Sequence, residues 1–221
     1  TRQDERPGLP GFLVVPEYGR DPYGEDLNTL WVLHFLLVVT GVASIYNLTF
    51  VEYQREKKEF SKDELRNFIK RKCSVPEQRN VYNENTVKKD IAVLLKNYVA
   101  PKDLKNIEDF SALLIGLGLI VNKDSDVYSY RVTEPEDIAP DVVLFALLTL
   151  SGGDKTLSFD ILQKLSLVFC LPIISLIDII RKIEKLYPGM VVFSDNSGIK
   201  NVQFIGELNR FDVLDNYYDS L

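Results

Sequence analysis

The sequence predicts a mainly α-helical protein with small β-hairpins, arranged as two winged-helix-like units. Three observations lead to this prediction. Apolar residues recur at the spacing of amphipathic helices in several stretches of the chain. Residues that favour helix starts precede these stretches. The order of helices followed by a β-hairpin, which is typical of a winged helix, occurs twice along the chain.

Proline and glycine punctuate the first twenty residues, and both residue types interrupt helices and strands. We therefore expect residues 1–27 to form an irregular segment. The first winged-helix-like unit should then comprise residues 28–134 and the second residues 135–221, joined near Glu134-Pro135-Glu136.

The most apolar stretch predicts a buried helix over Leu30–Val39, because it is hydrophobic on nearly every face. Asn28 is the expected N-cap, since its side-chain oxygen can accept from the free amides of the first turn. Gly41 should end the helix. The only histidine, His34, lies within this stretch, and we expect it to be buried and hydrogen-bonded.

Two further helices and a hairpin are expected in the first unit. Ser61 and Glu64 form a capping-box pattern ahead of an apolar stripe at helical spacing. The next helix should begin at Asn83 or Asn85 and stop before Pro101. Its apolar face consists of Val87, Ile91, Leu94, Leu95 and Tyr98. The hairpin strands are expected at Leu119–Val121 and Tyr128–Val132.

The second unit repeats this order. We expect helices over Asp141–Leu150 and Ser158–Leu165, then a longer helix opened by Pro172. A hairpin of Met190–Phe193 and Ile199–Phe204 should follow.

The distribution of charge indicates one positively charged face within an acidic protein. The chain carries a net charge of −6, but residues 54–105 hold 14 Lys and Arg against 8 Asp and Glu. The remaining residues hold 12 basic and 24 acidic side chains. Such a segment predicts an anionic partner. The alternative is a solvated helix surface whose charge bias has no function.

The helix that starts near Asn85 is the best candidate for contact with double-stranded DNA. With its apolar stripe buried, its outer face would lie in the major groove, as in a helix-turn-helix. Lysine neutralises phosphates and asparagine pairs with adenine. The candidate DNA-binding residues are Asn85, Lys88, Lys89 and Lys96 on this helix and Lys62, Arg66 and Lys70 on the preceding one.

In the second unit, the long helix exposes Asp178 beside its cations Arg181, Lys182 and Lys185. A carboxylate on this face would repel phosphate, and the surrounding segment is acidic. A protein-interaction or structural role is therefore expected here.

Asp21, Glu25 and Asp26 form the carboxylate cluster that most resembles a hard-metal site, such as one for Mg²⁺. Carboxylates immediately before a helix also favour its positive end, and Pro22 and Gly24 indicate a turn. We favour this structural interpretation, so no cofactor and no metal site are predicted. Mg²⁺ would be required only if the protein were a nickase.

Other chemistry is not indicated. Cys73 and Cys170 are far apart and lack metal-ligand spacing, which predicts two reduced thiols and a cytoplasmic protein. The segment Gly152–Thr156 lacks the first glycine and the preceding strand of a phosphate-binding loop. The longest apolar run is too short to cross a bilayer, so no membrane partner is expected.

Three blocks of sequence resemble a known family. The first is Asp21-Pro22-Tyr23-Gly24-Glu25-Asp26, followed by Thr29-Leu30-Trp31-Val32-Leu33-His34. The second is Asn83–Ile91, and the third, which is weaker, is Leu113–Ile120 with Tyr130. In this order and spacing, from Asp21 onward, the chain resembles the bacterial domain-of-unknown-function family numbered four-thousand-and-seven.

The resemblance implies a function that the residues alone do not give. Members of the family accompany DNA phosphorothioation and phage-restriction genes, and one branch includes the SspB-type nicking subunit of a single-strand phosphorothioation system. The resemblance implies that the protein is a DNA-engaging or scaffold subunit of a bacterial DNA phosphorothioation-linked modification and anti-phage defence system. Other subunits of that system would be its partners. The alternatives are a metal-dependent DNA nickase and a non-enzymatic protein-interaction module. The family usually begins with an FSGHETF-like motif, which this sequence lacks, so we expect an N-terminal module to be missing.

Overall fold

The computed structural model describes residues 13, 19–41, 43–74, 82–101, 113–196 and 198–221. Most of the expected irregular segment 1–27 lies outside these residues. Two compact units are present. The central unit comprises residues 35–134 and 163–173, and the terminal unit comprises residues 1–34, 135–162 and 174–221. Helices α2 (Leu27–Val39) and α8 (Phe159–Val168) are divided between them.

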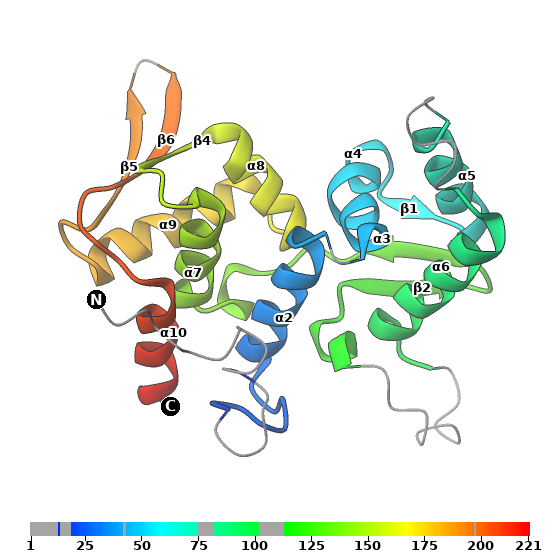
Figure 1. The fold of residues 1–221 in the computed structure, drawn as a ribbon, viewed down its shortest axis with the longest axis horizontal. Coiled ribbons are helices and arrows are strands. Elements are labelled where there is room, and N and C mark those ends of the chain that lie inside the picture. Colours follow the sequence, from blue (N-terminus) through cyan, green and yellow to red (C-terminus); the bar gives the residue numbers. More distant parts are fainter. Residues whose placement is uncertain (1–12, 14–18, 42, 75–81, 102–112, 197) are drawn as a thin grey trace. The chain divides into compact units, whose positions relative to one another are not determined.

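The described residues are mainly helical, with two small antiparallel sheets, which confirms the predicted fold class at this level (Figure 1). Both expected hairpins are present, and each is joined by a short strand from earlier in the chain that the sequence pattern did not predict. The strand order is β1-β3-β2 in one sheet and β4-β6-β5 in the other. Each sheet therefore places its last strand in the middle.

The central unit begins with an almost continuous helical stretch of α3 (Ser44–Asn47), the π-helix η1 (Leu48–Tyr53) and α4 (Gln54–Glu56). Strand β1 (Glu59–Phe60) follows, then α5 (Lys62–Lys72) and α6 (Glu84–Tyr98). The unit continues with the 3₁₀-helix η4 (Leu113–Leu117) and the hairpin of β2 (Ile120–Asp124) and β3 (Val127–Tyr130). The predicted order of two helices and a hairpin is confirmed.

Aromatic side chains hold the central unit together. The ring centroids of Phe50 and Tyr98 are 4.9 Å apart, and those of Tyr53 and Phe68 are 4.8 Å apart. The hydroxyl of Tyr130 donates to the carbonyl of Thr49 at 2.9 Å. These contacts join the π-helix, both long helices and the sheet, so the positions of α5 and α6 are fixed by one shared core.

The terminal unit contains the 3₁₀-helix η5 (Pro135–Asp137), α7 (Pro140–Ser151) and β4 (Thr156–Ser158). Helix α9 (Ile173–Leu186) is followed by the hairpin of β5 (Val191–Asn196) and β6 (Ile199–Phe204), and then by α10 (Arg210–Asp219). Helix α7 ends where Gly152 adopts a left-handed conformation with a φ of 57°. Helix α10 packs against α7.

Within the described residues, no single helix is both long and apolar enough to cross a bilayer, although two bent helix pairs reach that length together. Cys73 is half-buried and Cys170 is buried, and both are free thiols. Burial raises the pKa of the Cys170 thiol to about 12, which disfavours the reactive thiolate.

Candidate nucleic-acid interface

Helix α5 is fixed by a capping box and an apolar stripe, as the sequence predicts. The Ser61 hydroxyl accepts from the backbone amide of Glu64 at 3.2 Å, and the Glu64 carboxylate accepts from the amide of Ser61 at 2.9 Å. The stripe of Leu65, Phe68 and Ile69 is buried. The helix therefore turns its polar side outward, with Lys62 and Lys70 exposed and Arg66 half-buried.

Of the two predicted starts of helix α6, Asn83 is confirmed, and the first helical residue is Glu84. Asn83 is the N-cap, and its side-chain oxygen accepts from the amide of Thr86 at 3.1 Å. The predicted apolar face is buried at Ile91, Leu94, Leu95 and Tyr98, and half-buried at Val87. The predicted outer face is exposed throughout, at Asn85, Lys88, Lys89, Ala92 and Lys96.

The candidate cations lie beside carboxylates of the same unit. The ammonium of Lys88 is 3.1 Å from Glu84, and the guanidinium of Arg66 is 3.0 Å from Asp63. The ammonium of Lys62 is 3.9 Å from Asp126. Exposed ion pairs of this kind contribute at most about 1 kcal/mol, so they exchange readily for another anion.

Helices α5 and α6 pack against each other and bring part of the predicted set together (Figure 1). The hydrogen bond from Lys88, followed by the positive charges of Lys88, Arg66 and Lys70, lowers the pKa of Glu84. Arg66 and Lys70 of α5 therefore share one electrostatic neighbourhood with Lys88 of α6.

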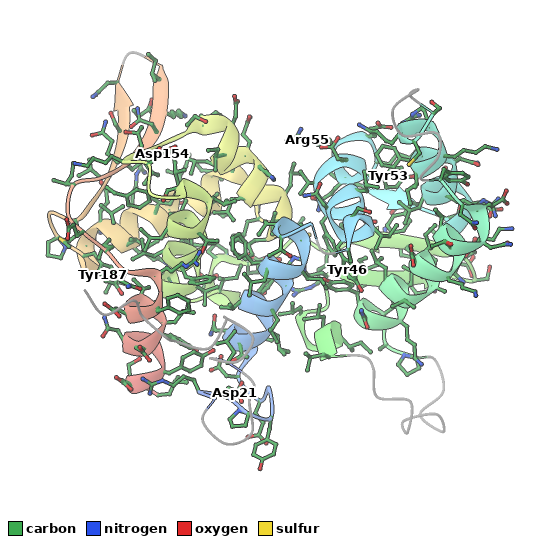
Figure 2. The ribbon with its side chains drawn as sticks, in the orientation of Figure 1. Asp21, Tyr46, Tyr53, Arg55, Asp154 and Tyr187 are labelled. Carbon is green, nitrogen blue, oxygen red and sulfur yellow. The ribbon has the colours of Figure 1, made fainter. Side chains whose placement is uncertain are left out.

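The acidic turn ahead of α2 has an architectural role (Figure 2, where Asp21 is labelled). The Asp21 carboxylate accepts from the backbone amides of Glu25 at 3.0 Å and Asp26 at 2.9 Å. Partial burial favours a higher pKa for Asp21, but hydrogen bonds from the Thr29 side chain and these amides outweigh it and lower the pKa. Gly24 closes the turn with a φ of 64°.

The prediction that Asn28 caps this helix is wrong. Asp26 occupies that role, because its carboxylate accepts from the amides of Asn28 at 2.6 Å and Thr29 at 3.2 Å. Asn28 lies inside the helix, where its side-chain oxygen accepts from the amide of Ala139 at 2.8 Å and its amide group donates to the Tyr217 hydroxyl at 2.7 Å. The earlier start lets Asn28 join α2 to the segments before α7 and within α10.

The carboxylates of the acidic turn are engaged within the protein. Both oxygens of Asp21 accept backbone amides, and Asp26 also accepts from the Tyr217 hydroxyl at 2.9 Å. Among the residues that the structure describes, no group of three or more histidine, cysteine or acidic side chains is arranged to hold a metal. The hydrogen bonds of Asp21 and Asp26 instead fix the entry to α2, which is the structural role favoured from the sequence.

We expect the double variant Asp21→Asn with Asp26→Asn to be less stable by about 1–2 kcal/mol, because the charge-assisted hydrogen bonds to the helix amides weaken. Urea unfolding followed by circular dichroism would measure the loss. Glu25→Gln is the matched control, since it removes a carboxylate from an exposed position of the same turn. Stoichiometric Mg²⁺ or Mn²⁺ binding by the parent that the double variant loses would contradict the architectural role.

His34 is fully buried in α2, as predicted, and its ring meets Trp31 edge-on at a centroid distance of 6.0 Å. The Trp31 indole donates to the carbonyl of Asp137 at 2.8 Å. Both aromatic residues therefore belong to the core.

The exposed surface of α9, which corresponds to the outer face of α6, carries both positive and negative side chains. Asp178, Arg181, Lys182 and Lys185 are exposed, as predicted, and the guanidinium of Arg181 is 3.7 Å from Asp178. Glu184 accepts from the backbone amide of Phe193 in β5 at 2.7 Å, so a second carboxylate is held on this helix.

Sequence reasoning missed a pocket of about 680 Å³ in the terminal unit. It lies between the loop after α7 and the segment that leads into α10, and its charged lining residues are Asp154, Lys155, Glu207 and Arg210. The lining therefore contains two charges of each sign. Residues 152–155 line one side of this pocket, and α10 was not predicted.

Comparisons with known proteins agree with the resemblance noted from the sequence. The crystal structure of SspB matches with a TM-score of 0.79 and 21% identity, over 94% of this chain and 64% of that chain. A magnesium ion-bound SspB crystal structure matches with the same TM-score and coverage at 23% identity. The present chain therefore spans 64% of the length of these proteins, and at this identity the similarity concerns the fold. The chain matches no curated protein sequence.

The family match covers nearly the whole sequence, from residue 8 to residue 218. It includes the acidic turn, α2, both helices of the basic face and the second repeat. The chain belongs to the family described as protein of unknown function DUF4007.

Proposed function

We propose that this chain is a DNA-engaging or scaffold subunit of a bacterial DNA phosphorothioation-linked modification and anti-phage defence system. The link to phosphorothioation rests on the family and on the SspB-like fold. The proposed ligand is double-stranded DNA. The observation that carries the DNA assignment is the outer face of α6, whose polar and cationic residues are all exposed opposite a buried apolar stripe.

The element order supports two winged-helix-like units. In the first set, the helical stretch of residues 44–56 is followed by β1, α5, α6, β2 and β3. In the second, α7 is followed by β4, α8, α9, β5 and β6. Apart from the 3₁₀-helix η4 between α6 and β2, both sets share this order, and both sheets have the same strand arrangement, which supports our proposal of two winged-helix-like units.

Each predicted residue has a proposed role. Lys88, Lys89 and Lys96 would neutralise phosphates along the groove that α6 enters. Asn85 is suited to pair with adenine, and the small side chain of Ala92 permits close approach. The α5 residues Lys62, Arg66 and Lys70 would hold the DNA backbone.

In this proposal α9 serves protein contacts with other subunits of the system, because its exposed face and surroundings contain carboxylates that repel phosphate. The free thiols are consistent with a cytoplasmic location.

A metal-dependent nickase is the alternative that the magnesium ion-bound SspB structure brings forward. In this chain the carboxylates of Asp21 and Asp26 accept amide and hydroxyl protons and organise the start of α2. No catalytic step is therefore assigned to them. A non-enzymatic interaction module would differ from the proposed function in having no affinity for DNA.

The proposal is tested by measuring the affinity of the chain for a fluorescent duplex of mixed sequence between about 50 and 200 mM salt, a range over which phosphate contacts weaken strongly. Each neutralised phosphate contributes about −0.9 to the slope of log affinity against log salt, so the six candidate cations allow a slope of up to about −5. A slope near zero, or no binding at the lowest salt, would contradict the DNA assignment and favour the interaction module.

A further inference from the structure

Glu84 is placed where the candidate phosphate-binding cations meet. It is the first residue of α6, and its carboxylate is 3.1 Å from the ammonium of Lys88 one turn later. The α5 residues Arg66 and Lys70 contribute positive charge at the same carboxylate. Glu84 is therefore paired with one cation of its own helix and also feels the charge of two cations of α5.

This position distinguishes Glu84 from the other carboxylates beside the predicted cations. Asp63 pairs with Arg66 within a single helix at 3.0 Å, and Asp126 lies 3.9 Å from Lys62. At Glu84, the contact with Lys88 of α6 is joined by positive charge from Arg66 and Lys70 of α5.

A carboxylate and a backbone phosphate present the same kind of acceptor to an ammonium or guanidinium group, namely negatively charged oxygens. Both cannot occupy the same site, because like charges repel at contact distance. The side chains of Glu84 and Lys88 are each half-exposed, so the ion pair can open without disturbing the core.

We propose that Glu84 occupies, in the free protein, the position that one backbone phosphate takes when DNA binds, and that it thereby weakens DNA binding. This inference rests on the proposed function. Glu84 thereby weakens the binding of any polyanion to the basic face, because a duplex must displace the carboxylate before Lys88 can engage a phosphate.

The decisive variant is Glu84→Gln, which keeps the shape of the side chain and removes its charge. We expect its affinity for the same duplex to rise about two- to five-fold at low salt, the range that an exposed ion pair allows. The slope of log affinity against log salt should become steeper by up to about 0.9, since one more phosphate is neutralised.

Asp90→Asn is the matched control. It removes the same charge from an exposed position of the same helix, where Asp90 contributes, after burial, to the raised pKa of Tyr46 in α3. A general change in net charge would affect both variants equally. Local competition for a phosphate should raise the affinity of Glu84→Gln clearly more than that of Asp90→Asn.

A double-mutant cycle separates competition from an effect on the helix. In a Lys88→Ala background, Glu84→Gln should gain less affinity than it does in the parent, because the main partner of the carboxylate is gone. Urea unfolding of each variant identifies any loss of folded protein, and binding is compared only between variants that are fully folded in the assay.

The outcomes are distinct. A selective gain by Glu84→Gln that shrinks in the Lys88→Ala background supports the inference. Salt-dependent binding that Glu84→Gln leaves unchanged, or changes no more than Asp90→Asn does, overturns the inference and leaves the proposed function standing. Absence of binding by both the parent chain and Glu84→Gln overturns the proposed function and the inference with it.

Discussion

Replacing Ile91 with alanine is expected to lower the free energy of unfolding by about 2–5 kcal/mol, which is the usual cost of truncating a buried large side chain. Ile91 lies in the middle of α6 and is 2% exposed. The loss combines the transfer free energy of the missing methyl groups with the cavity that remains. Because α6 also carries the candidate DNA-binding residues, this substitution tests the core that positions them.

Val93→Ala provides the control for this prediction. Val93 lies two residues later on the same helix and is 55% exposed, so its truncation should change stability by less than about 0.5 kcal/mol. Urea unfolding of both variants, analysed with a common slope, gives the comparison. Similar losses at the two positions would show that α6 does not bury the face that the structure assigns to it.

The helices of the basic face could be predicted from the sequence because their determinants are local. The capping box of Ser61 and Glu64 lies within four residues, and the apolar stripe of α6 repeats at helical spacing. The start of α2 was misplaced for the opposite reason. Asn28 and Asp26 are both good caps, and the choice depends on Ala139 and Tyr217, which are remote in sequence.

The short elements could not be predicted in this way. Strand β1 has two residues and β4 has three, and each exists because a distant hairpin strand pairs with it. A stretch of that length has no periodicity of its own. The π-helix from Leu48 to Tyr53 likewise depends on packing, since its buried residues include Thr49 as well as aromatic side chains.

In the candidate interface, too, features that depend on local sequence could be predicted and features that depend on packing could not. The exposure of Lys88 and Lys89 follows from the buried stripe on the other side of α6, and it could be predicted. The effect of the charges of Arg66 and Lys70 on Glu84 could not be predicted, because it depends on how α5 packs against α6. The sequence therefore indicated the basic face but not the carboxylate within it.

The double variant Lys88→Ala with Lys89→Ala is expected to bind DNA more weakly and with a shallower salt dependence. If each lysine neutralises one phosphate, the slope of log affinity against log salt becomes shallower by up to about two units. The ratio of parent to variant affinity should then fall by up to about twelve-fold between about 50 and 200 mM salt. Both side chains are exposed, so stability should change little.

Arg181→Ala with Lys182→Ala is the matched control, because it removes the same charge from exposed positions of the corresponding helix, α9. Arg181 already lies beside Asp178, so its loss should affect DNA binding much less. The affinity of the parent and both variants is measured over one salt series. Equal losses from the two variants would remove the assignment of α6 as the DNA-contacting helix, since net charge alone would then explain the binding.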